Sequence, residues 1–205
     1  MTTVYLLRHS KPLQVNNELN SDNLQVQNEK RCLSVEGEKF AKEKLSNKEL
    51  KSIDVLYASN YVRAIGTAKY IAENNNIDIN IISDLGERKY GVKSWDEKPK
   101  DFERKQFLDE NYKIGNGESR KEVSKRMYKA IMDIVSNNKD KTIAIVSHAT
   151  AISYFLKNWC DIQIVDDKLK YSFNDKVFLN GPLNYCETFK LVFDGDKILD
   201  IQNIK

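Results

Sequence analysis

Three short, mostly apolar runs lie far apart in the chain, and none of them alternates regularly between apolar and polar positions. They cover residues 4–7, 54–58 and 142–146. Uninterrupted apolar runs of this length are typical of parallel strands, because such strands are buried on both faces of a sheet. The pattern therefore predicts three inner strands of one parallel sheet.

Helical patterns lie between and after these strands. Ser34 is a suitable N-cap for one helix, and a second helix is predicted to start near Asn60. Ser119 and Glu122 form a capping-box pattern before a long amphipathic stretch, and a further helix is predicted over residues 150–158. Strands that alternate with helices favour an α/β fold with right-handed crossovers.

Two segments depart from this alternation. Residues 188–193 and 198–201 flank a turn at Asp194-Gly195 and are predicted to form a C-terminal hairpin. Residues 88–117 are charged and aromatic with little periodicity, so we expect a cap-like insertion that lies over the sheet. We expect a single domain over residues 1–205, built as a three-layer αβα sandwich with a mostly parallel central sheet.

The composition argues against several classes of protein. Lys and Arg number 33 against 30 Asp and Glu, a net charge of +3, whereas nucleic-acid binders usually concentrate a basic excess. The three cysteines form no CxxC pair, which argues against a disulfide framework or a zinc ribbon. The apolar run around residues 142–156 is too short and too polar to cross a membrane. We expect a soluble cytoplasmic protein, and a homodimer stays open.

Both histidines of the chain follow predicted strands. His9 comes after residues 4–7 and His148 after residues 142–146, and open parallel sheets bind ligands at this carboxyl edge. Arg8 precedes His9, and Arg63 lies in the first turn of a helix, from where its side chain can reach back over the sheet. Two guanidinium groups and two imidazoles suit a phosphoryl group, whose transfer depends on positioning and charge stabilisation.

Six blocks of the sequence, in order, resemble those of the histidine phosphatase superfamily, which includes the cofactor-dependent phosphoglycerate mutases. They are Leu7-Arg8-His9-Ser10, Leu33-Ser34-Val35-Glu36-Gly37, the block from Ser59 to Ala68 around Arg63-Ala64, Leu85-Gly86-Glu87, Gly117-Glu118-Ser119 and Val146-Ser147-His148-Ala149. A single Arg-His pair would be weak evidence, whereas six ordered blocks between residues 4 and 156 are specific. The resemblance implies a phosphoglycerate mutase-like fold.

The resemblance also implies catalytic roles for the residues at the predicted sheet edge. His9 would be the nucleophile that forms a phosphohistidine, with its other ring N–H held by an acceptor such as a backbone carbonyl. Arg8, Arg63 and a protonated His148 would hold the phosphoryl oxygens.

A carboxyl group is needed to protonate the leaving oxygen. Glu87 is the predicted general acid, and it would then act as the base for the water that cleaves the phosphohistidine. Glu118 is the competing candidate. Because it directly precedes a predicted helix N-terminus, where an ionised carboxylate is favoured, Glu118 suits a structural or phosphate-pocket role better.

The match departs from the family pattern around the phosphate. The glycine that usually follows each histidine is replaced by Ser10 and Ala149, and glycine is normally used where the backbone approaches a ligand closely. The asparagine that the family often has six residues after the nucleophile falls at Val15, so Asn16 is assigned in its place. Ser59 completes the predicted phosphate-binding residues.

We expect no metal and no other cofactor, because both histidines are assigned to phosphate and no carboxylate cluster suggests Mg²⁺ coordination. Activity should therefore survive excess EDTA. The leading hypothesis is a phosphatase for a small phosphorylated metabolite. The alternatives are a bisphosphoglycerate-dependent phosphoglycerate mutase, a ribonuclease-like enzyme that uses the histidines as acid and base, and a non-catalytic module that binds phosphorylated ligands. Classical mutases are usually longer than 205 residues, which favours hydrolysis.

Overall fold

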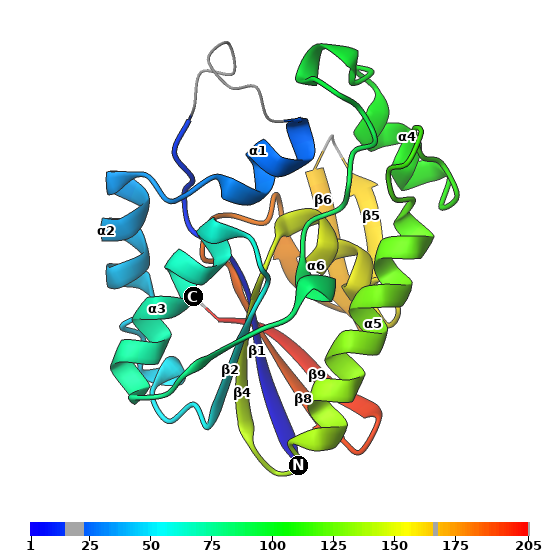
Figure 1. Cartoon of the computed structure of the whole chain (residues 1–205). Coiled ribbons are helices and arrows are strands. Elements are labelled where there is room, and N and C mark those ends of the chain that lie inside the picture. The colour runs from blue at the N-terminus through cyan, green and yellow to red at the C-terminus, as the bar shows by residue number, and fades with distance from the viewer. Residues whose placement is uncertain (15–22, 166–167, 205) are drawn as a thin grey trace.

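Figure 1 shows the computed structural model of the chain, which describes residues 1–14, 23–165 and 168–204. These residues include a six-stranded sheet with the order β3-β2-β4-β1-β8-β9. Its strands are β1 (Thr2–Arg8), β2 (Val55–Ala58), β3 (Ile79–Ile81), β4 (Thr142–Ser147), β8 (Thr188–Asp194) and β9 (Lys197–Ile204). The first four strands are parallel, whereas β8 and β9 run antiparallel to their neighbours. The expected α/β fold with a mostly parallel central sheet is confirmed.

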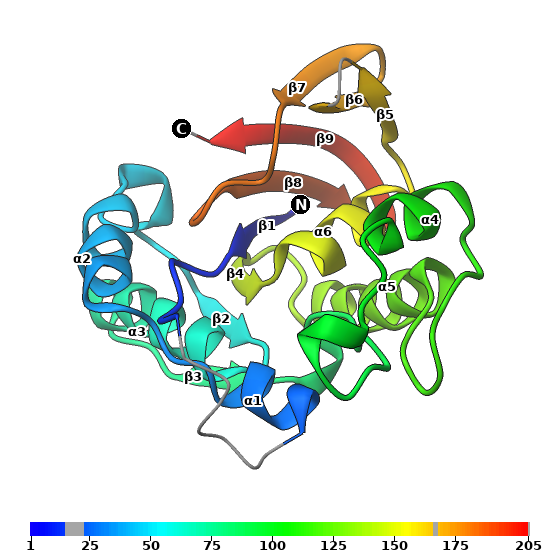
Figure 2. The same cartoon turned by 90° about the horizontal axis from the view of Figure 1, so that it is seen from above.

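Helices cover both faces of this sheet (Figure 2). The helices on one face are α2 (Val35–Lys44) and α3 (Val62–Asn75), and those on the other are α5 (Arg120–Asn137) and α6 (Ala149–Leu156). Along β1 the buried side chains alternate, since Val4 and Leu6 belong to the core cluster of α5 and α6, whereas Tyr5 and Leu7 belong to that of α2 and α3. Burial on both faces explains the uninterrupted apolar run.

The predicted element boundaries are largely confirmed. Ser34 caps α2 by accepting a hydrogen bond from the Gly37 N–H, and Ser119 and Glu122 form a capping box at α5. The C-terminal hairpin is β8 and β9, with Gly195 at a φ of 59° in its turn. Short 3-10 turns lie at Lys48–Leu50, Ser83–Leu85 and Trp95–Glu97. No helix in the described ranges combines the length and apolar character that a bilayer-spanning segment needs.

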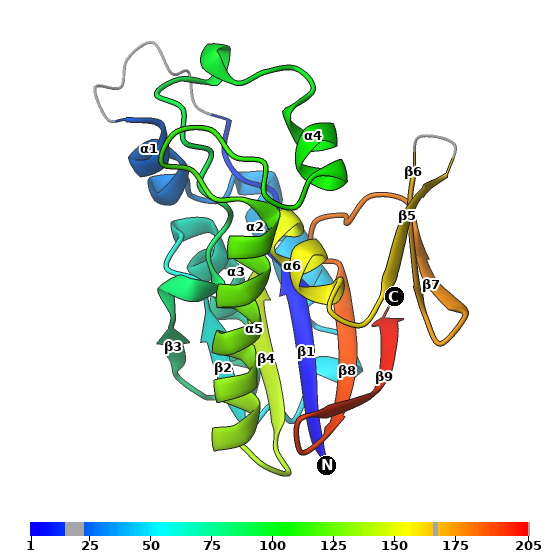
Figure 3. The same cartoon turned by 90° about the vertical axis from the view of Figure 1, so that its right-hand side faces the viewer.

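Two short helices lie beyond the carboxyl edge of the parallel strands, as Figures 1 and 3 show. They are α1 (Leu24–Lys30) and α4 (Phe102–Leu108), and α4 is part of the segment 88–117 that the sequence predicts as an insertion. Within this segment Tyr90, Trp95 and Phe102 pack their rings together, with centroid distances of 5.0 and 5.9 Å. Arg88 is buried and donates a hydrogen bond to the hydroxyl of Tyr154 in α6, which fixes the segment to the α/β body.

Residues between α6 and β8 form a second sheet that the sequence did not predict. It consists of β5 (Asp161–Val165), β6 (Lys168–Phe173) and β7 (Lys176–Asn180), all antiparallel. Figure 3 shows this sheet next to β9. Each strand has one buried residue, namely Ile162, Tyr171 and Leu179, and all three belong to the core cluster that α5 and α6 also line. The short apolar stretches of β5 and β7 are only partly buried, so they differ from the buried runs that predict the strands of the central sheet.

Candidate active site

The carboxyl ends of three strands bring residues together that are far apart in the chain. Because β1, β2 and β4 are parallel neighbours, they end at one edge of the sheet. His9, Ser59 and His148 directly follow these strands. The ring centroids of His9 and His148 lie 5.0 Å apart, so the two histidines share one site.

His9 is held in one orientation by two hydrogen bonds. Its Nδ1 lies 2.6 Å from the carbonyl oxygen of Ser10, and its Nε2 lies 3.1 Å from Nε of Arg63. Since a guanidinium only donates, Nε2 accepts with its lone pair and Nδ1 carries the proton donated to Ser10. Burial, reinforced by the charge of Arg63, lowers the pKa of His9 well below its usual value. His9 is therefore a neutral imidazole whose Nε2 lone pair faces a cation.

His148 is fully buried beside it. Its Nε2 lies 2.7 Å from Oγ of Ser59, which in turn accepts a hydrogen bond from the backbone N–H of Tyr61. Burial, together with Arg63 and His9 nearby, lowers the pKa of His148 well below its usual value. The structure therefore favours a neutral His148, in contrast to the protonated ring expected from the sequence. Within the described residues, Nδ1 of His148 has no hydrogen-bond partner.

Two arginines flank the histidines, and backbone carbonyls and aromatic rings hold them. Arg63 is buried, donates to the carbonyl of Asn28 and lies 4.7 Å from the ring centre of Tyr61. Arg8 donates to the carbonyl of Leu183 and lies 4.2 Å from the ring centre of Tyr185. Neither guanidinium forms an ion pair with a carboxylate in the described part of the chain, so both charges remain available to an anion.

Tyr61 and Tyr185 were not predicted from the sequence. Tyr61 lies inside a recognised block, where its identity carries no signal of its own. Tyr185 lies in an irregular segment before β8, and nothing in the sequence indicates that it packs on Arg8 and lies 6.1 Å from the ring centre of His9.

The side chain of Glu87 contacts the N-terminus of α6, the helix that begins directly after His148. Its Oε1 accepts hydrogen bonds from the backbone N–H groups of Arg88 and Ala151 at 2.9 and 3.1 Å, and its Oε2 accepts one from Thr150 at 3.3 Å. These donors fix the orientation of the carboxylate. The structure thus joins Glu87 to the chain segment that carries His148.

Glu118 is paired with Arg126 of α5, at 2.7 Å from its Nε and 2.9 Å from its Nη2. Arg126 also donates to the backbone carbonyls of Gly86 and Glu87, at 3.0 and 3.2 Å. The structure therefore places Glu118 with the segment that carries Glu87. Sequence reasoning missed Arg126, because an arginine on the polar face of a long helix resembles any solvated charge.

Ser10 and Ala149, which replace the usual glycines, both adopt ordinary backbone conformations without a positive φ. Ser10 is fully buried, donates from Oγ to the Gly37 carbonyl at 2.7 Å and from its N–H to Oγ1 of Thr67 at 2.9 Å. Ala149 is the first residue of α6. Asn16, the remaining predicted phosphate ligand, lies outside the described residues.

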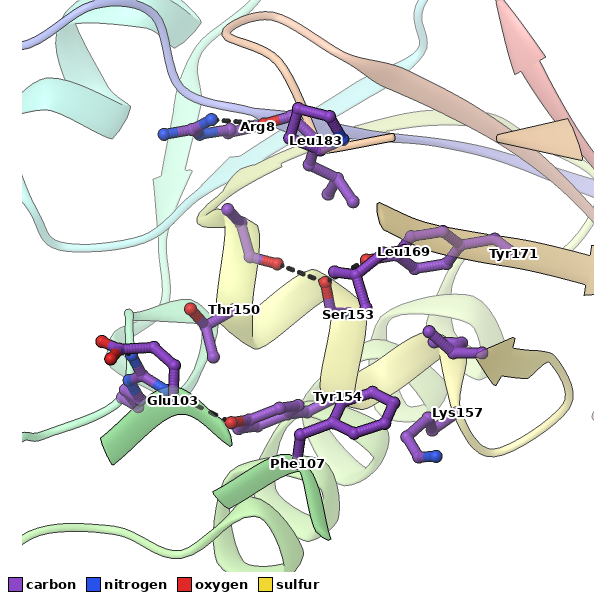
Figure 4. Close-up of a pocket in the computed structure, with 14 residues that line it drawn as sticks. Arg8, Glu103, Phe107, Thr150, Ser153, Tyr154, Lys157, Leu169, Tyr171 and Leu183 are labelled. Atoms are coloured by element: carbon purple, nitrogen blue, oxygen red, sulfur yellow. Dashed lines mark hydrogen bonds and ion pairs between the residues drawn. The ribbon is translucent and has the colours of Figure 1, made fainter. Parts of the chain in front are cut away.

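A cavity of about 300 Å³ is lined by Arg8 and Ala149, the chain neighbours of the two histidines, and by residues of α4 and α6 (Figure 4). Arg8 and Ala149 border it at the end nearest to the histidines, and α4, α6 and the second sheet supply most of its wall. No group of three or more His, Cys, Asp or Glu side chains within the described ranges could hold a metal ion.

A family model and several solved structures match the chain. The model of the histidine phosphatase superfamily (branch 1) matches residues 4–171. No curated protein matches the chain.

Several solved structures share the fold at low sequence identity. A mycobacterial glucosyl-3-phosphoglycerate phosphatase with VO₃ superposes with a TM-score of 0.71 at 15% identity, over 98% of this chain and 96% of that one. The phosphoserine phosphatase of Entamoeba histolytica with 3-phosphoglyceric acid gives 0.68 at 18% identity, over 100% and 98%. YhfR of Bacillus stearothermophilus gives 0.65 at 21% identity, over 97% and 95%.

Proposed function

The chain belongs to the histidine phosphatase superfamily, branch 1, and on this basis we propose that it hydrolyses small phosphomonoesters through a phosphohistidine on Nε2 of His9. The observation that carries the proposal is the tautomer of His9. Its Nδ1 proton is donated to Ser10, so the lone pair of Nε2 points to the cationic group of Arg63. For in-line attack, the phosphoryl group would take the place of Arg63 in front of this lone pair, and the guanidinium would donate to a phosphoryl oxygen instead.

The proposed reaction has two displacements. In the first, Nε2 of His9 forms a bond to phosphorus while the bond from phosphorus to the ester oxygen breaks. In the second, water attacks the phosphohistidine, inorganic phosphate leaves, and His9 is restored. Arg8, Arg63 and Nδ1 of His148 would donate to the phosphoryl oxygens, and removing one such donor costs about 10²–10³-fold in rate.

Glu87 is the proposed general acid and base. It would give its proton to the leaving oxygen in the first displacement and take a proton from water in the second. Three backbone N–H groups orient its carboxylate, and two of them come from the helix that follows His148. Arg126 and Glu118 support this role by fixing the carbonyls of the Glu87 segment.

The test combines turnover with trapping of the intermediate. The wild-type protein should release phosphate from a panel of phosphomonoesters, and this activity should persist in excess EDTA. A rapid alkaline quench should preserve phosphohistidine on the peptide that contains His9, whereas acid should destroy it. His9→Ala should remove both signals while circular dichroism and unfolding show an intact fold.

The same panel separates the alternatives. With 3-phosphoglycerate and bisphosphoglycerate, formation of the isomer faster than release of phosphate would indicate a mutase. Cleavage of RNA that survives loss of Arg63 would indicate ribonuclease-like chemistry. If no ester is turned over but phosphorylated ligands bind tightly, the chain would be a non-catalytic binding module.

A further inference from the structure

The cavity of about 300 Å³ is lined in part by residues next to the proposed reacting groups. Arg8, Ala149 and Thr150 all border it. Arg8 belongs to the cluster around the histidines, and the N–H of Thr150 holds the carboxylate of Glu87, the proposed proton donor. The cavity therefore borders the groups that are proposed to react, and Thr150 links it to the side of the proposed proton donor.

The wall of this cavity is mainly apolar, and much of it comes from the second sheet. Ile162, Leu169 and Tyr171 line it from β5 and β6, and Leu183 lines it from the segment before β8. Phe107 of α4 closes the opposite side, as Figure 4 shows. The insertion and the second sheet thus form the two sides of one cavity.

Three hydroxyl groups that border the cavity, those of Ser153, Tyr154 and Tyr171, already form hydrogen bonds within the protein. Oγ of Ser153 donates to the Ala149 carbonyl at 2.9 Å and lies 2.8 Å from the Tyr171 hydroxyl. The hydroxyl of Tyr154 bonds to Gln106 at 3.1 Å. A leaving group with several hydroxyls would compete with these bonds, so it would lose its own hydration without equivalent new partners.

The charged groups at the cavity are also engaged. The guanidinium of Arg88 pairs with Glu103 at 3.0 Å. The ammonium of Lys157 lies 5.0 Å from the ring centre of Phe107, and burial lowers the pKa of Lys157. Neither feature requires an anionic leaving group, whereas the apolar wall gains free energy when it contacts carbon.

We propose that this cavity binds the leaving group and selects the phosphate ester of an apolar alcohol, aromatic ones included, and that the second sheet provides this selectivity. The inference rests on the proposed phosphatase function. It adds the class of substrate and assigns a role to β5 and β6, which lie outside the catalytic cluster.

The test compares two esters of primary alcohols, 2-phenylethyl phosphate and glycerol 3-phosphate. Because both release a primary alkoxide, their intrinsic reactivity is similar and the ratio of their kcat/KM values reports on the cavity. We expect kcat/KM for the phenylethyl ester to be about 10- to 100-fold higher, the effect of burying one large apolar group.

Two variants of the second sheet locate the effect. Leu169→Ala shortens a side chain of the cavity wall and should lower kcat/KM for the phenylethyl ester about 5-fold, with the glycerol ester changed less than about 2-fold. The matched control is Val177→Ala, because Val177 lies in β7 of the same sheet, is 44% exposed and does not line the cavity. This substitution should leave kcat/KM for both esters unchanged.

The outcomes separate the two proposals. If neither ester nor any other phosphomonoester is turned over, the phosphatase function fails, and the role of the cavity fails with it. If esters are turned over but the glycerol ester is equal or better, the cavity proposal alone is overturned. It is also overturned if Leu169→Ala lowers kcat/KM for both esters equally.

Discussion

At the scale of single residues, Ser10 shows how a departure from a family pattern is accommodated. Its hydroxyl bonds to the Gly37 carbonyl, and its backbone has no positive φ that would require glycine. The side chain therefore links the segment that follows β1 to α2. Its carbonyl at the same time holds Nδ1 of His9.

Ser10→Gly should consequently destabilise the protein while it leaves the chemistry in place. Loss of the hydrogen bond to Gly37, together with the extra freedom of glycine in the unfolded chain, should lower the free energy of unfolding by about 1–2 kcal/mol. Urea denaturation measures this change. The value of kcat should stay within about 3-fold of wild type, and a large rise in kcat would contradict this account of Ser10.

The members of the proposed catalytic cluster could be singled out because histidine and arginine are chemically distinctive and follow predicted strands. His9, Arg63 and His148 could be assigned in this way. Arg126 could not, since its importance comes from carbonyls of a segment 39 or more positions away. The neutral state of His148 was also hidden, because burial is a property of the assembled site.

At the scale of elements, α2 packs closely against the segment that follows β1 because Gly37 has no side chain. A Cβ on Gly37 would lie 2.0 Å from the carbonyl oxygen of Lys11, two residues after His9. Lys11 also accepts a hydrogen bond from the N–H of Ser34, the N-cap of α2. The backbone of α2 and the backbone of the segment that follows β1 are thus held in close contact.

Gly37→Ala should break this contact. We expect the free energy of unfolding to fall by about 1–3 kcal/mol, because backbone must move to relieve the overlap, and we expect kcat to fall with it. Gly66→Ala is the control, since its Cβ would meet Leu33 at an ordinary 3.4 Å inside α3. In that variant the free energy of unfolding should rise by about 0.5–1 kcal/mol. Equal effects of the two substitutions on unfolding would refute the contact argument.

The strands of the central sheet were easier to predict from the sequence than those of the second sheet. β1 and β4 are buried on both faces and give continuous apolar runs. β5 and β7 bury a single residue each, and most of their other apolar residues, namely Ile164, Val165 and Val177, are exposed. Tertiary contact with β8, β9 and α6 stabilises them, and such contacts leave no periodic signal in a single sequence.

At the scale of the whole molecule, two buried neutral histidines couple folding to pH. Burial lowers the pKa of both His9 and His148 in the folded protein, whereas an unfolded chain titrates histidine near pH 6.5. Above this pH both states are unprotonated. Below it the unfolded state binds protons that the folded state does not, so stability falls as the pH falls.

The size of this effect follows from proton binding to the unfolded chain. Between pH 7.5 and pH 5.5 each histidine should remove about 1.4 kcal/mol of stability, which amounts to about 2–3 kcal/mol for both. Urea denaturation at these two pH values measures the loss. In the double variant His9→Gln and His148→Gln, which cannot titrate at these positions, stability should change much less over the same interval. A wild-type protein equally stable at both pH values would show that the histidines are solvated or charged in the folded state, and the neutral nucleophile would then lose its physical basis.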